Sequence, residues 1–244
     1  MHMRNSRRPV WIAVCLGLGW SGLASAAEEK SPCTEDAMLV FDASKSMAAA
    51  DAGAAGLRRI DSVRTALARV LPRVAPRRRL GLITYGPGSR AVCSNIALEL
   101  RPQLDAADRI QARVNALLPE GRTPLTSAAR RAADALDRSG RPGTIVLLTD
   151  GEESCNGAPC DLAKALKAEN ANLTVHVVSY RIKGSIGSDG VFKAACLAKE
   201  TGGLYVATET IDELAAELEK MLACPYVSER PRRSLRSRSV ASVR

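Results

Sequence analysis

Three oxygen-bearing side chains follow the first apolar segment that precedes a helix-like stretch. The segment LVFDASKSM, residues 39 to 47, places Asp42, Ser44 and Ser46 at alternate positions. Asp and Ser are the residues that cap the free N–H groups at a helix start. Carboxylate and hydroxyl oxygens are also the ligands that hard divalent cations prefer. The segment alone therefore leaves both interpretations open.

Short apolar segments alternate with longer amphipathic segments along most of the chain. We expect strands at 37–41, 80–86, 95–100, 143–151, 173–180 and 203–207, and helices at 59–71, 105–118, 124–136, 161–168, 190–200 and 210–222. Asp105 is expected to cap one helix, and Thr210 with Glu213 forms a T-x-x-E capping box for the last helix. A Gly/Pro loop between 80–86 and 95–100 predicts a hairpin. The pattern predicts one doubly wound α/β domain over residues 33–224, with a mostly parallel sheet, one antiparallel edge strand and helices on both faces.

A second aspartate, Asp150, ends another apolar strand, GTIVLLTDG at 143–151. Ligands of doubly wound sheets bind at the carboxyl ends of the strands, where the winding reverses. If the two Asp-ending strands are neighbours, Asp42 and Asp150 share one crevice. Two close carboxylates are unfavourable unless a cation lies between them, so this arrangement favours a metal site over capping alone.

The spacing of these residues resembles the von Willebrand factor type A domain family. DASKSM resembles the D-x-S-x-S of the family's metal-ion-dependent adhesion site, which also uses a threonine and a second aspartate. EGRTPLTSA supplies Thr123, 81 residues after Asp42, and LLTDGEES supplies Asp150 27 residues later. GLITYG, TDGEES with the following PC, and TGGLYV look most like the exported bacterial branch of the family. The resemblance covers about Cys33 to Cys224.

The resemblance implies a role for each site residue. Ser44, Ser46 and Thr123 would ligate the ion through their hydroxyls. Asp42 and Asp150 would act mainly through water or as acceptors behind the ligands. An oxygen-only set with retained waters suits Mg²⁺, with Mn²⁺ as a substitute. The ion would stay electrophilic, and a carboxylate from a protein or other anionic ligand would complete its shell.

Lys45 departs from the resemblance, because many relatives have glycine at this position. It is not a ligand position, so the metal site is compatible with it. A positive charge beside the ion is expected to favour an acidic ligand further. A solvated lysine without a specific role is the alternative interpretation.

Six cysteines remain after residue 26: Cys33, Cys93, Cys155, Cys160, Cys196 and Cys224. An even number in an exported chain predicts disulfides, and zinc is disfavoured because no C-x-x-C pair occurs. The family resemblance implies a Cys33–Cys224 pair, since both ends of that fold lie opposite the site. Two schemes remain open for the other four: Cys155–Cys160 with Cys93–Cys196, or Cys93–Cys155 with Cys160–Cys196.

The two ends of the chain carry most of its formal charge of +9. Residues 1–26 combine three arginines, an apolar run at 10–20 and the A-x-A sequence at 24–26, and they predict a secretory signal peptide. Residues 225–244 are rich in Arg and Ser and are expected to be disordered. The nearly neutral segment between them gives no indication of specific nucleic-acid binding. The tail is expected at most to contact an anionic surface weakly, and no membrane span is expected after signal removal.

We expect a non-enzymatic, exported binding module, periplasmic or secreted, that captures an acidic group. His176, the one histidine after the signal, lies in an apolar strand and is interpreted as a sheet histidine.

A Mg²⁺-dependent hydrolase of phosphate esters is the alternative, because the strand-end aspartates also resemble haloacid-dehalogenase-like enzymes. Those enzymes need D-x-D, whereas residue 44 is Ser. A further alternative is an accessory subunit of a larger complex. The sequence names no partner and no oligomeric state.

Overall fold

The computed structural model describes Cys33 and residues 35–54, 56–88, 92–136, 141–182 and 192–224. The signal peptide expected at 1–26 and the tail expected at 225–244 lie outside the described residues. All structural statements below concern the described part of the chain.

Six strands form one sheet in the order β3-β2-β1-β4-β5-β6. The strands are β1 (Asp36–Asp42), β2 (Leu80–Tyr85), β3 (Ile96–Gln103), β4 (Gly143–Thr149), β5 (Leu173–Tyr180) and β6 (Tyr205–Thr208). Every neighbouring pair is parallel except β2 with β3, which is antiparallel and places β3 at one edge. The prediction of a mostly parallel sheet with one antiparallel edge strand is therefore confirmed.

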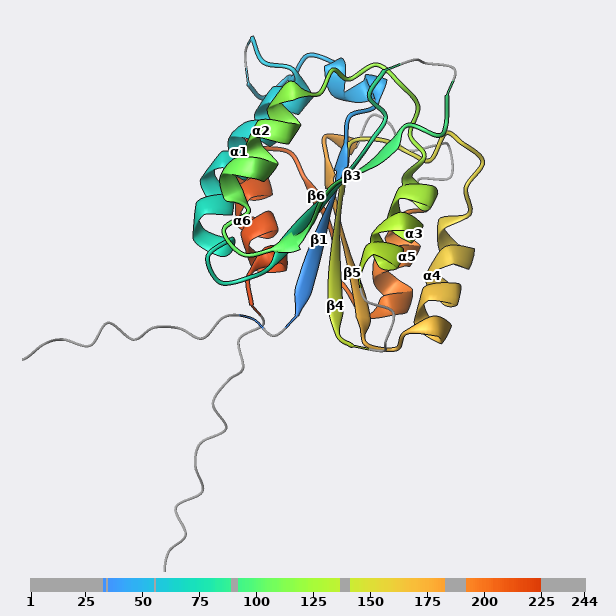
Figure 1. The fold of residues 1–244 in the computed structure, drawn as a ribbon. Coiled ribbons are helices and arrows are strands. Elements are labelled where there is room, and N and C mark those ends of the chain that lie inside the picture. The colour runs from blue at the N-terminus through green and yellow to red at the C-terminus, as the bar shows by residue number, and fades with distance from the viewer. Residues whose placement is uncertain are drawn as a thin grey trace, which may run out of the picture. The chain divides into compact units, whose positions relative to one another are not determined.

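Helices cover both faces of the sheet (Figure 1). One face carries α1 (Arg59–Val74), α2 (Ala107–Ala116) and α6 (Ile211–Leu222). The opposite face carries α3 (Leu125–Ala135), α4 (Pro159–Glu169) and α5 (Ala195–Thr201). A short 3-10 helix, η1 (Lys45–Ala48), follows β1 at the top of the view in Figure 1.

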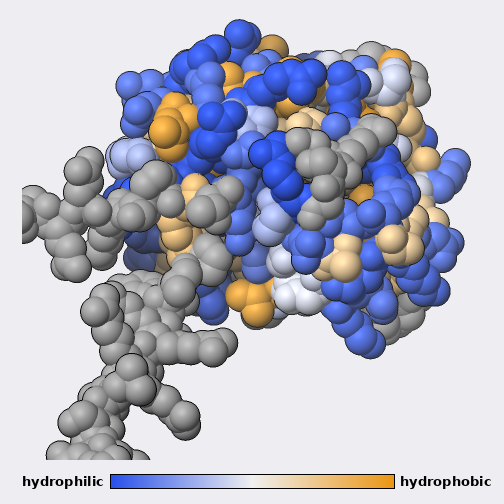
Figure 2. All heavy atoms as spheres, turned by 60° about the horizontal axis from the view of Figure 1, so that its bottom comes forward, coloured by the Kyte–Doolittle hydropathy of each residue, from blue (hydrophilic) through white to orange (hydrophobic). Residues whose placement is uncertain are grey.

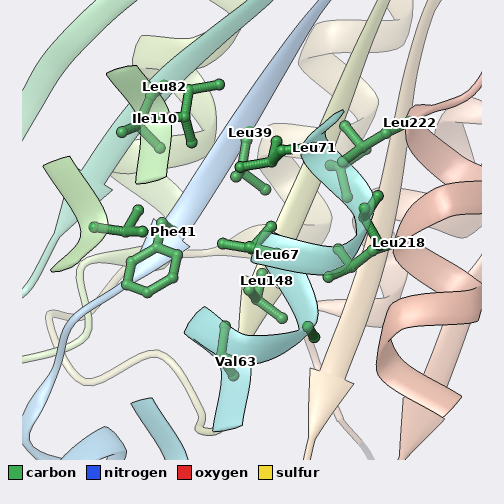
Figure 3. Packing of buried hydrophobic residues seen from close by; sticks show 14 of the residues in the cluster. Leu39, Phe41, Val63, Leu67, Leu71, Leu82, Ile110, Leu148, Leu218 and Leu222 are labelled. Atoms are coloured by element: carbon green, nitrogen blue, oxygen red, sulfur yellow. The ribbon is translucent and has the colours of Figure 1, made fainter. Parts of the chain in front are cut away.

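The core has two layers because side chains of the central strands point alternately to the two faces. All of β4 is buried, and β1 is buried from its second residue onward. Figure 3 shows one layer, in which strand side chains meet helices α1, α2 and α6: Leu39, Phe41, Leu82, Leu148, Val63, Leu67, Leu71, Ile110, Leu218 and Leu222. Burial on both faces explains why these two strands lack polar alternation.

Several expected helix starts differ from the structure, including those of α2, α4, which begins at Pro159 rather than 161, and α5. Asp105 does not cap α2: the N-cap residue is Ala106, which makes no side-chain cap bond. Asp105 adopts φ 53° and donates its N–H to the carbonyl of Ala75, so its backbone forms a turn before the helix. The helix expected at 190–200 begins at Ala195 as α5. Residues 190 and 191 lie outside the described residues.

The last helix has half of the expected capping box. The Thr210 side chain accepts a hydrogen bond from the N–H of Glu213 at 3.1 Å. The Glu213 carboxylate accepts from the N–H of Glu209 at 2.8 Å, one residue before the position that a capping box uses. The start of α6 was therefore placed correctly, although its reciprocal bond is shifted.

Three disulfides are present within the described residues. Cys33 is bonded to Cys224, with a Cα–Cα distance of 5.4 Å, which is the pair that the family resemblance implied. The other bonds are Cys93–Cys155 and Cys160–Cys196. The second of the two open schemes is thus the one found.

Candidate metal centre

The candidate site lies at the carboxyl ends of β1 and β4. These strands are parallel neighbours in the middle of the sheet. The chain leaves β1 toward α1 on one face and leaves β4 toward α4 on the other, so the winding reverses between them. Asp42 is the last residue of β1, and Asp150 directly follows β4. Both aspartates are 0 % exposed, and the fold therefore places two carboxylates in one buried region.

Asp42 organises the turn that follows β1. Its Oδ1 accepts a hydrogen bond from the N–H of Ser44 at 2.7 Å, and its Oδ2 accepts one from the hydroxyl of Thr149 at 2.6 Å. The N–H of Lys45 donates to the carbonyl of Gly121 at 2.9 Å, which ties the turn to the loop before α3. The D-x-S-x-S segment is thereby held from two sides.

The two serines lie between the aspartates. The hydroxyl of Ser46 donates to Asp150 Oδ1 at 2.5 Å, and the hydroxyls of Ser44 and Ser46 are 3.0 Å apart. Ser44 is the N-cap residue of η1, but its side chain makes no cap bond. The capping interpretation of this segment is therefore not what the structure shows. The hydroxyls converge with the carboxylates instead.

Thr123 lies at the same opening. It is 6 % exposed, its N–H donates to the hydroxyl of Ser154 at 2.8 Å, and its carbonyl accepts from the Ser154 N–H at 3.1 Å. Thr123 and Ser46 line a shared pocket of about 360 Å³, together with Lys45, Glu120, Gly121, Arg122, Gly151, Glu152 and Ser154. The structure thus brings all five sequence-derived site residues to one end of the sheet, four of them in one hydrogen-bonded network.

Arg59 is a site residue that the sequence analysis missed. Its Nη1 donates to Asp150 Oδ2 at 2.9 Å, and the pair is an ion pair with one fully buried partner. Arg59 is the first residue of α1 and is 91 residues from Asp150. Arg59 belongs to no sequence motif. The position of a strand-end aspartate does not indicate which arginine or lysine pairs with it.

Gly86 is a second residue that only the structure identifies. It follows β2 with φ +84°, a conformation that L side chains rarely adopt. A Cβ at this position would lie 2.6 Å from the N of Ser44 and 2.8 Å from the carbonyl oxygen of Arg122. Only glycine therefore lets the β2–β3 loop pack directly against the D-x-S-x-S turn.

The two acids perturb each other and their surroundings. Burial, followed by the charge of Asp42, raises the pKa of Asp150 to about 6. Burial also raises the pKa of Asp42, against the hydrogen bonds from Ser44 and Thr149. The pKa of Tyr85 is raised well above its usual value by burial and then by the Asp42 charge. The Tyr85 hydroxyl is buried without a hydrogen-bond partner among the described residues.

This donor set fits a small hard cation. Two carboxylates and neighbouring hydroxyls offer only oxygen, as Mg²⁺ and Mn²⁺ prefer. Among the described residues, no three His, Cys, Asp or Glu side chains gather in a cluster that could hold a metal. A metal at this position would therefore depend on the hydroxyls of Ser44, Ser46 and Thr123 rather than on a cage of acids.

The loop after Asp150 is fixed at the rim of the pocket. Glu153 accepts the N–H of Thr126 at 2.8 Å with Oε2 and the N–H of Cys155 at 2.7 Å with Oε1. The Cys93–Cys155 disulfide links this loop to the loop between β2 and β3. The loop after Asp150 is therefore covalently joined to the loop between β2 and β3.

Charged side chains of both signs surround the opening. Lys45 and Arg122 are exposed and both line the pocket. Arg122 Nη1 donates to the carbonyl of Ser154 at 3.3 Å, which holds the guanidinium near the rim. Glu120 is an exposed acid at the same rim, so the charge there is mixed.

His176 lies away from this centre. It is half-buried within β5, and its Nδ1 accepts a hydrogen bond from the N–H of Leu204 at 3.0 Å. Burial is the main cause that lowers the pKa of His176. The interpretation as a sheet histidine agrees with this position.

Comparisons with known proteins agree with the fold. Residues 37–153 match the family model described as von Willebrand factor type A domain. The uncharacterized protein YwmD of Bacillus subtilis (strain 168) is 31 % identical over 107 residues, which cover 43 % of this chain and 46 % of YwmD. The match thus spans less than half of that relative's length.

Solved structures share the architecture at low sequence identity. An aerotolerance-related membrane protein from Bacteroides fragilis superposes with a TM-score of 0.58 at 19 % identity, over 77 % of this chain and 98 % of that protein. Proximal thread matrix protein 1 from the mussel byssus, described with a zinc-occupied MIDAS motif, superposes with a TM-score of 0.56 at 16 % identity, over 78 % of this chain and 46 % of that protein. At such identities the likeness establishes the fold alone.

The disulfides bear on the location of the protein. Three disulfides within one domain are typical of oxidising compartments and indicate an exported protein. Within the described residues, no helix has the length and apolar character needed to span a membrane.

Proposed function

The chain carries a von Willebrand factor type A domain, and we propose that it is a non-enzymatic binding module whose metal-loaded site captures an acidic group of a protein partner. Domains of this family commonly mediate protein interaction or adhesion. The metal, its ligands and the acidic class of partner are our proposal for this chain.

The observation that carries the proposal is the network at the ends of β1 and β4. Ser46 connects the two sides of the network, because its hydroxyl contacts both Ser44 and Asp150. Two fully buried carboxylates on adjacent strands are costly unless they serve a cation.

Each residue has a defined task in the proposed site. Ser44, Ser46 and Thr123 hold the ion through hydroxyl oxygens. Asp150 orients the Ser46 hydroxyl and Asp42 holds the backbone N–H of Ser44, and both carboxylates would accept hydrogen bonds from water around the ion. When bound, Mg²⁺ supplies an electrophilic position to which a carboxylate can bind, because neutral hydroxyls do not cancel its charge. Mn²⁺ is the expected substitute, and the zinc-occupied motif of the mussel matrix protein supports a metal in this fold.

Lys45 favours an acidic partner over a cationic one. Its exposed charge beside the pocket adds positive potential to that of the ion, while the rest of the lining carries charges of both signs, on Arg122, Glu120 and Glu152. No described histidine lies at the pocket, and His176 is bound within the sheet. We therefore assign binding rather than catalysis to this centre, in a protein located in the periplasm or outside the cell.

Affinity capture from periplasmic and envelope extract tests the proposal. Tagged residues 27–244 are used as bait in Mg²⁺ and in EDTA, with Asp42→Ala as the site variant. A second bait that ends at Cys224 removes the Arg-rich tail and controls for its charge. We expect proteins captured by wild type and by the tailless chain in Mg²⁺, and lost in EDTA and with Asp42→Ala. Equal capture by all baits in both buffers would contradict a metal-gated site.

A further inference from the structure

Arg59 is built into the scaffold beside the acid pair. It is the first residue of α1, and its N–H donates to the carbonyl of Ala49 at 2.9 Å, which anchors the backbone. Its side chain is 20 % exposed, whereas Asp150, its partner at 2.9 Å, is 0 % exposed. The Arg59 side chain therefore extends from the surface and its guanidinium contacts the buried carboxylate of Asp150.

The two acids accept hydrogen bonds from donors of different charge. Asp42 accepts from the backbone N–H of Ser44 and from the hydroxyl of Thr149, both neutral donors. Asp150 accepts from a hydroxyl on one oxygen and from Arg59 on the other. Within the described part of the chain, Arg59 thus brings one positive charge to two buried carboxylates. Removing a single partner of a buried ion pair is strongly destabilising, because it leaves a buried charge uncompensated.

We propose that Arg59 is the resident counter-cation of the Asp42–Asp150 pair, which keeps the site folded without metal and leaves it positively charged once metal is bound. The second half of this inference rests on the proposed function. With a divalent ion present, two carboxylates and one guanidinium leave a net charge of about +1 at the site, by the formal charges of the groups. Arg59 therefore lowers the affinity for the metal itself and strengthens the attraction for a partner carboxylate.

The neighbouring residue provides a matched control. Arg58 directly precedes Arg59, but its guanidinium pairs with Asp61 at 2.8 Å on the surface, with both side chains partly exposed. Arg58→Gln and Arg59→Gln remove the same charge from adjacent positions. A difference in unfolding temperature or metal affinity between the two variants is therefore due to the contact with Asp150 and not to the net charge of the chain.

The first arm measures thermal unfolding of residues 27–244 in EDTA. Arg59→Gln is expected to unfold about 5–10 °C below wild type, since it breaks a buried pair, whereas Arg59→Lys keeps the charge and is expected to lose much less. Arg58→Gln is expected within about 2 °C of wild type, as is usual for an exposed pair. In the double variant Arg59→Gln/Asp150→Asn the loss is expected to be largely recovered, which excludes a general folding defect. An Arg59→Gln midpoint equal to that of Arg58→Gln would overturn the counter-cation role.

The second arm titrates Mg²⁺ and Mn²⁺ alone into each variant by calorimetry. Arg59→Gln is expected to bind the ions about tenfold more tightly than wild type, because one repelling charge is gone. Unchanged or weaker binding by Arg59→Gln would overturn the inference and make Arg59 a positioning group. If wild type takes up no metal while Arg59→Gln still melts early in EDTA, the proposed metal site fails and the counter-cation role stands.

Discussion

At the scale of single residues, the site depends on oxygen atoms whose partners are fixed by the backbone. The D-x-S-x-S spacing predicted Asp42, Ser44 and Ser46 together, and the strand-end rule predicted that Asp150 joins them; the structure places these four in one network. Arg59 could not be predicted, because an ion pair across 91 residues leaves no local pattern. Whether the network binds Mg²⁺ stays a prediction.

Reversing the charge of Lys45 is expected to weaken partner capture without removing the metal. Lys45 is exposed on η1 and is not placed among the ligands, so Lys45→Glu changes the potential at the opening alone. At physiological ionic strength we expect an affinity loss of several-fold, roughly 1 kcal/mol for a partly screened charge. The measurement is the dissociation constant of the captured partner in Mg²⁺.

Lys164→Glu is the control for this change. Lys164 is exposed on α4, which is not part of the pocket, and the substitution alters net charge equally. It is expected to leave affinity within about twofold of wild type, because Lys164 does not line the pocket and exposed charges are screened by salt. Equal losses for the two variants would show that net charge, and not the rim, controls binding.

Gly86→Ala is expected to be considerably more destabilising than Gly56→Ala. Both glycines have positive φ, +84° and +80°, so both substitutions carry backbone strain of about 1–2 kcal/mol. A Cβ at Gly56 meets nothing within 4 Å, whereas one at Gly86 meets the backbone of Ser44. We expect about 1–3 kcal/mol of additional loss at Gly86 from this overlap. Urea unfolding of the two variants measures the difference, and equal losses would contradict the close approach.

At the scale of elements, the strands were predicted more accurately than the helix ends. β5 has the expected bounds, and β1 and β4 differ from the predicted bounds by two residues or fewer at each end, because continuous apolar segments define buried strands. Helix starts depend on local hydrogen bonds that the sequence specifies weakly. The prediction that Asp105 caps α2 was wrong, because its backbone is in the left-handed conformation. The Glu213 carboxylate accepts from the N–H of Glu209 instead of the N–H of Thr210.

The last helix is fastened at several points. Arg69 pairs with Asp212 and Arg73 pairs with Glu219, which joins α1 to α6. Arg78 Nη1 donates to the carbonyl of Ala223 at 2.9 Å, and Cys224 is bonded to Cys33. These contacts restrict any sliding of the helix, so we expect α6 to keep one position in the free and the metal-loaded protein.

Removing the Cys33–Cys224 disulfide tests this restraint. The bond closes a loop with a sequence separation of 191 residues, and by chain entropy its loss in Cys33→Ser/Cys224→Ser is expected to cost roughly 4–5 kcal/mol. Hydrogen exchange in α6 is expected to be the same with Mg²⁺ and with EDTA in wild type, and faster overall in the variant. A large change of α6 exchange on adding Mg²⁺ to wild type would contradict a helix held in one position.

At the scale of the whole described domain, the order of the strands creates the site. The sheet order puts β1 beside β4, so two aspartates that are 108 positions apart in the sequence end on adjacent strands. The alternation of elements left it open whether these two strands are neighbours, and the resemblance to one family implied that their aspartates share a site. The sequence could not predict which disulfide scheme is present, since both remaining schemes were compatible with the spacing.

The opposite end of the domain offers a contrast. Figure 2 shows that the visible described residues on the face at the amino ends of the strands are mainly hydrophilic, with hydrophobic residues in small separate groups. A hollow of about 340 Å³ on this side, between α3 and α4, has a lining of mixed charge that includes Arg130, Arg141 and Glu169. Arg130 and Glu169 pair with each other at 2.5 Å. The converging acids and hydroxyls described above belong to the other end of the strands.

Anomalous diffraction from crystals grown with Mn²⁺ tests the central claim most directly. Mn²⁺ takes oxygen ligands as Mg²⁺ does, and its anomalous signal locates the ion independently of any assumed ligand. The account predicts one strong peak among Asp42, Ser44, Ser46, Thr123 and Asp150 in wild type, and its loss in Asp42→Ala. A fully formed network without a peak, or a peak at another place in the domain, would contradict it.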